Sequence, residues 1–196
     1  GLWEKISQQR ACAYTKMHVW DNDGTANINF SAAEIQQPEL GNIVENSILQ
    51  CAVLERIEQQ ENITLLRGVQ VASIEQEEAG TRILCSDGRI LTASLLVAAD
   101  GAQSKLRALS GIQVRQWEYQ HKAIVTTVKS SQSHQHTAWQ NFLPTGPLAF
   151  LPLEHPSENY CSIVWSVETE KADQLMALDD DEFAIALGKA FEHRLG

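Results

Sequence analysis

The chain has 196 residues, of which 43% are hydrophobic and 20% charged, with a formal net charge of −10. This length fits one domain or two small interleaved ones, and the apolar content is sufficient for a hydrophobic core. The acidic balance and the lack of a lysine- and arginine-rich cluster exclude a nucleic-acid partner. No apolar run approaches the roughly 18 residues of a membrane-spanning helix, so at most a peripheral membrane contact is expected.

The cysteines are far apart in the sequence and contain no C-x-x-C pair, which favours free thiols in a reducing compartment over disulfides or zinc binding. They are Cys12, Cys51, Cys85 and Cys161. His134 and His136 alternate in a Ser/Gln-rich loop with no third ligand nearby, so no metal site is expected. We therefore expect a cytoplasmic protein, and the second expected location is the periphery of the inner membrane.

In the first half of the chain, hydrophobic periodicity and turn residues predict two helices, a hairpin and a further short strand. The turn Asp21-Asn-Asp-Gly24 joins the two strands of the hairpin. The expected order is a helix over 2–9, a strand over 11–20, a strand over 26–30, a loop over 31–41, a helix over 44–60 and a buried strand over 63–66.

After these elements, three short strands separated by turn residues predict an antiparallel meander. These strands cover 69–77, 81–86 and 89–93. A buried strand over 95–99 and a helix over 104–110 are expected next. Strands over 119–130, 137–143, 148–152 and 159–167 follow, and helices over 168–178 and 180–195 close the chain.

The stretch from Leu95 to Arg107 carries the clearest functional pattern. An apolar run of the kind found in buried parallel strands ends in Asp100 and Gly101, and ligands bind at the carboxyl ends of such strands. Ser104 can cap the following helix, and Arg107 can pair with a phosphate or with the acid. From spacing alone, an ordinary capped strand–turn–helix explains the pattern equally well.

These four positions resemble the D-G-x-x-S-x-x-R signature of flavoprotein aromatic hydroxylases, the group that contains p-hydroxybenzoate hydroxylase. The resemblance implies that Asp100, Gly101, Ser104 and Arg107 belong to a cofactor site. In that group the acid lies near the pyrophosphate of FAD, and the segment also serves the reduced nicotinamide cofactor.

A second stretch, Val44-Glu-Asn-Ser-Ile-Leu-Gln50, places two amides one helical turn apart. By itself it reads as a capped surface helix. It also resembles the flavin-dependent hydroxylases of ubiquinone biosynthesis, which implies that Asn46, and more weakly Gln50, contacts the phosphate–ribityl part of FAD. Further similarity lies in 117–121, 142–153, 161–165 and 194–196.

The resemblance implies a mixed α/β fold in which an incomplete FAD/NAD(P)-binding domain is interleaved with a substrate domain on a mostly antiparallel sheet. Residues 41–111 would form the central part of the cofactor domain, and 1–40 with 112–196 the substrate domain. The glycine-rich G-x-G-x-x-G motif and the later G-D-A-A-H type segment are absent. We therefore expect an internal fragment that by itself binds FAD weakly or not at all and is inactive.

The implied activity is FAD-dependent hydroxylation of a prenylated phenol in ubiquinone biosynthesis, with NAD(P)H as reductant and O2 as oxygen source. Other proteins of a ubiquinone-biosynthesis complex are candidate partners. Four aromatic residues are candidates for the substrate pocket, although sheet core explains each of them at least as well. They are Trp139, Phe142, Phe150 and Trp165. No side chain stands out as a catalytic acid or base.

Two alternatives fit the sequence. One is another flavin aromatic hydroxylase or epoxidase that acts on a soluble aromatic compound, because the Asp100-Gly101 signature is common to the wider group. The other is a non-catalytic scaffold or interaction domain, which the missing glycine motif favours. A hydrolase or kinase is excluded, because the chain contains no G-x-S-x-G, H-E-x-x-H or P-loop motif.

Overall fold

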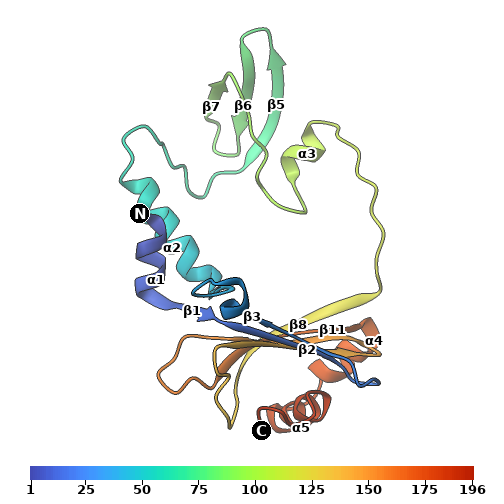
Figure 1. Ribbon diagram of the computed structural model, residues 1–196. Coiled ribbons are helices and arrows are strands. Elements are labelled where there is room, and N and C mark those ends of the chain that lie inside the picture. Colours follow the sequence, from blue (N-terminus) through green and yellow to red (C-terminus); the bar gives the residue numbers. More distant parts are fainter. The chain divides into compact units, whose positions relative to one another are not determined.

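Figure 1 shows a computed structural model of the protein, which describes residues 1–196. The chain divides into two compact units: unit 1 combines 1–59 with 118–196, and unit 2 consists of 60–117. The fold is mixed α/β, as predicted. None of the helices combines the length and the apolarity needed to cross a membrane.

A six-stranded sheet forms the centre of unit 1. Its strands are β2 (Lys16–Asp21), β3 (Asn27–Ser31), β8 (His121–Lys129), β9 (Thr137–Leu143), β10 (Gly146–Pro152) and β11 (Tyr160–Glu168), in the order β3-β2-β9-β10-β11-β8. All neighbours are antiparallel except β2 and β9, which run parallel. The amino-terminal hairpin thus joins the later strands, which confirms the predicted mostly antiparallel sheet.

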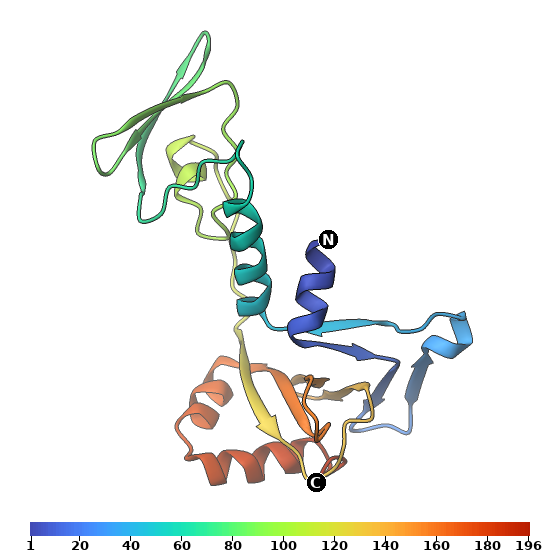
Figure 2. The same ribbon diagram turned by 90° about the vertical axis from the view of Figure 1, so that its left-hand side faces the viewer.

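Helices α4 (Thr169–Met176) and α5 (Asp180–Ala190) cover one face of this sheet, as Figure 2 shows. Along β11 every second residue is buried, because alternate side chains point to opposite faces. Phe191, just after α5, is 2% exposed and stacks on Phe150 of β10 with 3.8 Å between ring centroids. The core of unit 1 therefore lies between the sheet and the closing helices.

The amino-terminal part of unit 1 holds two helices and a second, two-stranded sheet. Its elements are α1 (Leu2–Arg10), β1 (Ala11–Tyr14), the 3-10 helix η1 (Ala32–Ile35), β4 (Gly41–Val44) and α2 (Asn46–Glu58), with β1 and β4 antiparallel. Ile6 of α1 and Ala52 of α2 are buried.

The strand predicted over 11–20 is in fact two strands that separate at Thr15. The backbone N–H groups of Thr15 and Lys16 both donate to the carbonyl of His136, and the carbonyl of Thr15 accepts from Ala32. These long-range bonds direct β1 to one sheet and β2 to another. The same pairing makes a strand of Gly41–Val44, which the sequence did not predict.

Unit 2 contains the predicted meander, formed by β5 (Val71–Glu77), β6 (Gly80–Cys85) and β7 (Ile90–Ala93), and the short helix α3 (Lys105–Leu109). Gly80 is required at the β5–β6 turn. Its φ is +142°, and a Cβ there would lie 2.3 Å from the carbonyl oxygen of Ala93.

Two predicted strands are wrong: neither 63–66 nor 95–99 forms one. Leu95 and Val97 are 76% and 70% exposed instead of buried. An apolar run supplies the side chains for a buried strand, but a strand also needs backbone partners, and no strand of the chain pairs with these residues. The assignment of 41–111 to a cofactor domain stays a prediction, and 41–59 pack with unit 1.

Candidate cofactor and substrate sites

In the loop before α3, two hydrogen bonds hold the carboxylate of Asp100 in place. The Ser104 hydroxyl donates to Asp100 Oδ1 at 2.5 Å, and the backbone N–H of Leu106 donates to Oδ2 at 3.1 Å. Ser104 Oγ also accepts from the backbone N–H of Arg107 at 3.0 Å, so this residue caps α3 as predicted. The hydrogen bond from Ser104, followed by that from Leu106, holds the pKa of Asp100 below its usual value.

The other two residues of the predicted signature complete this loop. Gly101 has a φ of +83° with no atom within 4 Å of a built Cβ, so the backbone conformation selects glycine there, and the space around it is open. The guanidinium of Arg107 donates to the carbonyl of Ala102 at 2.8 Å and does not contact the acid. The structure therefore brings Asp100, Gly101, Ser104 and Arg107 together in one loop of unit 2, which is held by hydrogen bonds between its own residues.

The start of α2 presents unused donors. Asn46 is the first residue of the helix and Gln50 lies one turn later; both are exposed, and neither amide has a partner in the chain. Glu45 occupies the N-cap position but makes no capping bond, because its carboxylate pairs with Arg10 at 2.8 Å. The N–H of Ile48 donates to the carbonyl of Glu45, so the N–H groups of Asn46 and Ser47 are the ones free to bind an anion.

Arg10 and Glu45 are 35 positions apart, and no sequence pattern pointed to their pairing. They line a cavity of about 360 Å³ in unit 1, between the start of α2 and the end of the large sheet. Its other lining residues are Thr127, Leu153, Glu154, His155 and Tyr160. The predicted cofactor residues of α2 lie in unit 1, whereas the Asp100 loop lies in unit 2. The two sets of predicted cofactor residues therefore belong to different compact units.

The four aromatic candidates fall on opposite faces of the sheet. Trp139 is paired with Phe150, and Leu148, two residues before Phe150, is paired with Trp165, so these three aromatic rings lie on the face under the helices. Phe150 and Trp165 are only 5% and 4% exposed and belong to the core. Phe142 lies on the other face and is 47% exposed.

The sheet face that carries Phe142 is called the half-open face, because most of its side chains are partly exposed. No sequence pattern identified the residues that share it. Only the strand register shows which residues share it, because each strand contributes every second position. Its apolar members include Met17, Val19, Phe142, Ala149, Leu151, Val164 and Val125. Thr127, on the same face, also lines the cavity beside Glu45, so this face reaches the start of α2.

Comparison with known proteins gives one family and consistent relatives. Residues 1–195 match the family described as FAD binding domain. The chain is 31% identical over its whole length to the 3-demethoxyubiquinol 3-hydroxylase of Escherichia coli K12, of which it covers 49%. It is 33% identical over 97% of its length to the mitochondrial ubiquinone biosynthesis monooxygenase COQ6 of Mus musculus, of which it covers 41%. The chain thus spans about half the length of these relatives, or less.

Among solved structures, the fold is similar to that of Pseudomonas aeruginosa PqsL, solved in complex with 2-aminobenzoylacetate. The TM-score is 0.76 with 21% identity, and the match covers 96% of this chain and 55% of PqsL. At this identity the likeness concerns the fold alone. It shows that the arrangement of sheets and helices described above occurs in a larger protein of known structure.

Proposed function

Because the chain belongs to the FAD binding domain family, we propose that it forms part of an FAD-dependent monooxygenase that hydroxylates a prenylated phenol in ubiquinone biosynthesis. Similarity to two ubiquinone hydroxylases along nearly the whole chain supports the substrate class. The structural observation that carries the proposal is the cavity in which the start of α2 meets the half-open sheet face. Glu45, the residue before the proposed cofactor residue Asn46, and Thr127 of the sheet face both line this cavity.

The residues present fit part of an FAD site. The uncapped N-terminus of α2 and the unpartnered amides of Asn46 and Gln50 are suited to donate to a phosphate or to ribityl oxygens. Asp100 is ionised and accepts hydrogen bonds only, so it is suited to hydroxyl groups or ordered water and not to phosphate oxygens. Bound FAD would supply the oxygen-transfer chemistry, with NAD(P)H as reductant and O2 as oxygen source.

The chain's own side chains would bind and orient the substrate. The half-open face has an apolar centre around Phe142 and Val164, which favours the prenyl tail and excludes water from a neighbouring ring. Arg10, Glu45 and His155 place polar groups at one end of this face. We assign no catalytic acid or base.

The cofactor part of the proposal is tested by FAD titration of the 196-residue chain, followed by flavin fluorescence. Because the chain lacks the glycine-rich phosphate motif, we expect weak or undetectable binding and no hydroxylation by the chain alone. Any measurable binding should fall on Asn46→Ala with Gln50→Ala and persist in Gln9→Ala. Tight binding that survives gel filtration would contradict the expected weakness, and binding unaffected by the α2 variants would remove those residues from the site.

The substrate class is tested separately by binding. The intrinsic tryptophan fluorescence of the chain is titrated with a short-chain prenylated phenol and with 4-hydroxybenzoate. We expect saturation with the prenylated phenol only, and its loss in Phe142→Asp, while the exposed change Ile185→Asp on α5 leaves it intact. A preference for 4-hydroxybenzoate would favour a hydroxylase of soluble aromatic compounds instead.

A further inference from the structure

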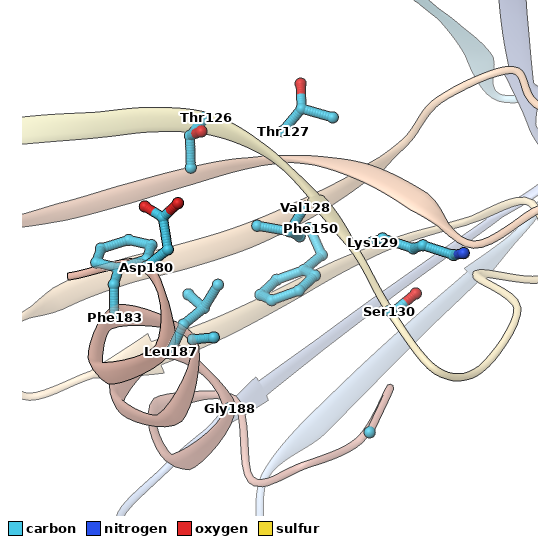
Figure 3. Close-up of a pocket in the computed structure, with 12 residues that line it drawn as sticks. Thr126, Thr127, Val128, Lys129, Ser130, Phe150, Asp180, Phe183, Leu187 and Gly188 are labelled. Atoms are coloured by element: carbon cyan, nitrogen blue, oxygen red, sulfur yellow. The ribbon is translucent and has the colours of Figure 1, made fainter.

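An aspartate is followed directly by a glycine at three places in the chain, namely Asp23-Gly24, Asp87-Gly88 and Asp100-Gly101. In such a pair the backbone nitrogen of the glycine can attack the side-chain carboxyl of the aspartate, because glycine has no Cβ to shield that nitrogen. Asp180, which lines the cavity between β8 and α5 (Figure 3), is followed by Asp181 within a helix and lacks this property. The three pairs are therefore the candidates for such self-modification.

The reaction is an isomerisation that needs no reagent besides water. The glycine nitrogen forms a bond to Cγ of the aspartate, and one carboxyl oxygen leaves as water with the amide proton and the carboxyl proton, which gives a five-membered cyclic imide. Water then adds to the imide carbonyl on the Cα side and breaks its bond to nitrogen, so the backbone now runs through Cγ as isoaspartate. The protonated carboxyl is the reactive form, so hydrogen bonds that stabilise the carboxylate slow the first step.

At Asp87-Gly88 both reacting groups are restrained. The carboxylate of Asp87 accepts from the backbone N–H of Arg89 at 3.1 Å and from its Nε at 2.6 Å. The side-chain hydrogen bond from Arg89, followed by the backbone one, lowers the pKa of Asp87. The N–H of Gly88 donates to the carbonyl of Cys85 at 3.0 Å, which holds the nucleophile in the turn.

At Asp100-Gly101, in the candidate cofactor loop, only the carboxylate is restrained. The N–H of Gly101 donates to no carbonyl of the chain, and the space around this glycine is open. Ser104 and the backbone N–H of Leu106 each donate to one oxygen of Asp100, and the bond from Ser104 contributes most to its lowered pKa. Protection of this pair therefore depends mainly on one hydroxyl group.

Asp23-Gly24 is the least restrained of the three pairs. It lies in the exposed turn between β2 and β3. The carboxylate of Asp23 accepts one long hydrogen bond, 3.3 Å from the side-chain amide of Asn22. The N–H of Gly24 also makes only a long bond, 3.4 Å to the carbonyl of Asp21. Hydrogen bonds of this length are weak, so both reacting groups are mobile enough to meet.

We propose that Asp23-Gly24 isomerises spontaneously to isoaspartate in the folded chain, and that Ser104 protects Asp100-Gly101 from the same reaction. This chemistry is independent of the proposed hydroxylase activity. Isoaspartate adds one atom to the backbone and so lengthens the hairpin turn. Strand β3 pairs only with β2 and places Phe30 opposite Met17 on the half-open face, so the modification loosens this edge of the face.

The test compares the folded 196-residue chain with the same chain unfolded in guanidinium chloride, both incubated for weeks in mildly acidic buffer at physiological temperature. Trypsin places the three pairs in separate peptides, 17–56, 83–89 and 90–105. Mass spectrometry with electron-transfer fragmentation distinguishes isoaspartate from aspartate in each peptide. In the folded chain we expect isoaspartate at Asp23 and much less at Asp87 and Asp100, whereas in the unfolded chain all three pairs should react.

Variants test each part of the proposal. Gly24→Ala should suppress the reaction at Asp23, because a Cβ shields the attacking nitrogen. Ser104→Ala should raise the isoaspartate content at Asp100 severalfold, whereas Ser104→Thr, which keeps the hydroxyl, should remain protected. Ser110→Ala, which removes only a bond to the carbonyl of Leu106, is the control and should match the wild-type chain.

The comparison of folded and unfolded wild-type chain needs no variant, so it holds even where a substitution disturbs α3. Equal yields at the three pairs of the folded chain would overturn the proposal, as would an unmodified Asp23 in the folded chain after the unfolded chain has reacted there. An unchanged yield at Asp100 in Ser104→Ala would refute the protective role of Ser104.

Discussion

At the residue scale, the hydroxyl of Ser104 organises the Asp100 loop, which we propose as a cofactor contact. Ser104 donates to the carboxylate and accepts from the helix backbone at the same time, and it is itself only 8% exposed. The sequence predicted both the cap and the acid, because each rests on local spacing. The path of the Arg107 side chain to the carbonyl of Ala102 was not predictable, since the sequence allowed either a phosphate or the acid as its partner.

Replacement of Ser104 by alanine should raise the pKa of Asp100 toward its ordinary value, because the strongest hydrogen bond to the carboxylate is lost. Loss of the cap should also destabilise α3 locally by about 1 kcal/mol. The carboxyl carbon of Asp100 reports the pKa in an NMR titration. Ser110→Ala, which removes only a bond to the carbonyl of Leu106, is the control and should leave the pKa unchanged. Identical titration of both variants would contradict the role of Ser104.

We predict that His134 makes the chain less stable in acid. It is 1% exposed, Nδ1 accepts from the backbone N–H of His136 at 3.1 Å, and Nε2 faces the carbonyl of Leu153 at 3.3 Å. Burial lowers the pKa of His134, partly opposed by the bond to Leu153, so the unfolded chain takes up the proton more readily. The stability that neutral His134 contributes is present above its unfolded pKa of about 6.5 and is lost as the pH falls below it.

The free energy of unfolding in urea, measured between pH 7 and pH 5, should therefore decrease in the wild-type chain. His134→Gln should lower stability at pH 7 by about 1–2 kcal/mol, because its hydrogen bonds are imperfectly replaced, and should flatten the decrease toward pH 5. The exposed His155→Gln is the control and should keep the wild-type slope. An unchanged slope in His134→Gln would show that another group causes the acid sensitivity.

At the element scale, local patterns placed the helices and the hairpin, whereas long-range bonds decided where strands begin and end. The predicted strand over 137–143 coincides with β9, and the meander of unit 2 has its predicted strand order. The separation of β1 from β2 depends on the carbonyl of His136, 121 positions after Thr15, and no local pattern carries such information. For the same reason, apolar composition alone misassigned 63–66 and 95–99.

The turn between β5 and β6 depends on glycine at position 80. Gly80→Ala should destabilise unit 2 by about 3 kcal/mol. A Cβ at this position would collide with the carbonyl of Ala93, and the positive φ of Gly80 would strain any residue other than glycine. Gly88→Ala is the matched control: it is also at positive φ but in open space, and should cost about 1 kcal/mol. Hydrogen exchange of the amides of β6 and β7 measures both effects. Equal protection in the two variants would contradict the steric argument.

At the scale of the whole molecule, the closing segment secures the large sheet. Phe191 stacks on Phe150 and also contacts Trp20 edge-on, with 5.2 Å between centroids, so it packs against both β10 and the amino-terminal hairpin. Asn141 on the same face donates to the carbonyl of Ala190 at 3.0 Å. The hairpin, the later strands and the last helix thus share one core.

Phe191→Ala should therefore lower the free energy of unfolding of unit 1 by about 3–5 kcal/mol, through the lost burial and the cavity that remains. Ile185→Ala, at a side chain that is 70% exposed, should change it by no more than about 0.5 kcal/mol. Chemical denaturation followed by tryptophan fluorescence measures both. Because the chain has two compact units, amide protection in the meander should stay unchanged in Phe191→Ala, and its loss would show that the units unfold together.

The mixed fold, the local motif around Asp100, a helix over 44–60 and the resemblance to flavin-dependent ubiquinone hydroxylases were all predictable from the amino-acid sequence; the helix is found at Asn46–Glu58, and the FAD binding domain match supports the resemblance. These properties depend on neighbouring residues or on similarity along the chain. By contrast, the folded chain was needed to show that Trp139, Phe150 and Trp165 face the helices while Phe142 faces the other way, and that Arg10 pairs with Glu45. The reason is physical: strand register and long-range pairing depend on which distant backbone groups find each other, and a shift of one residue reverses every side chain.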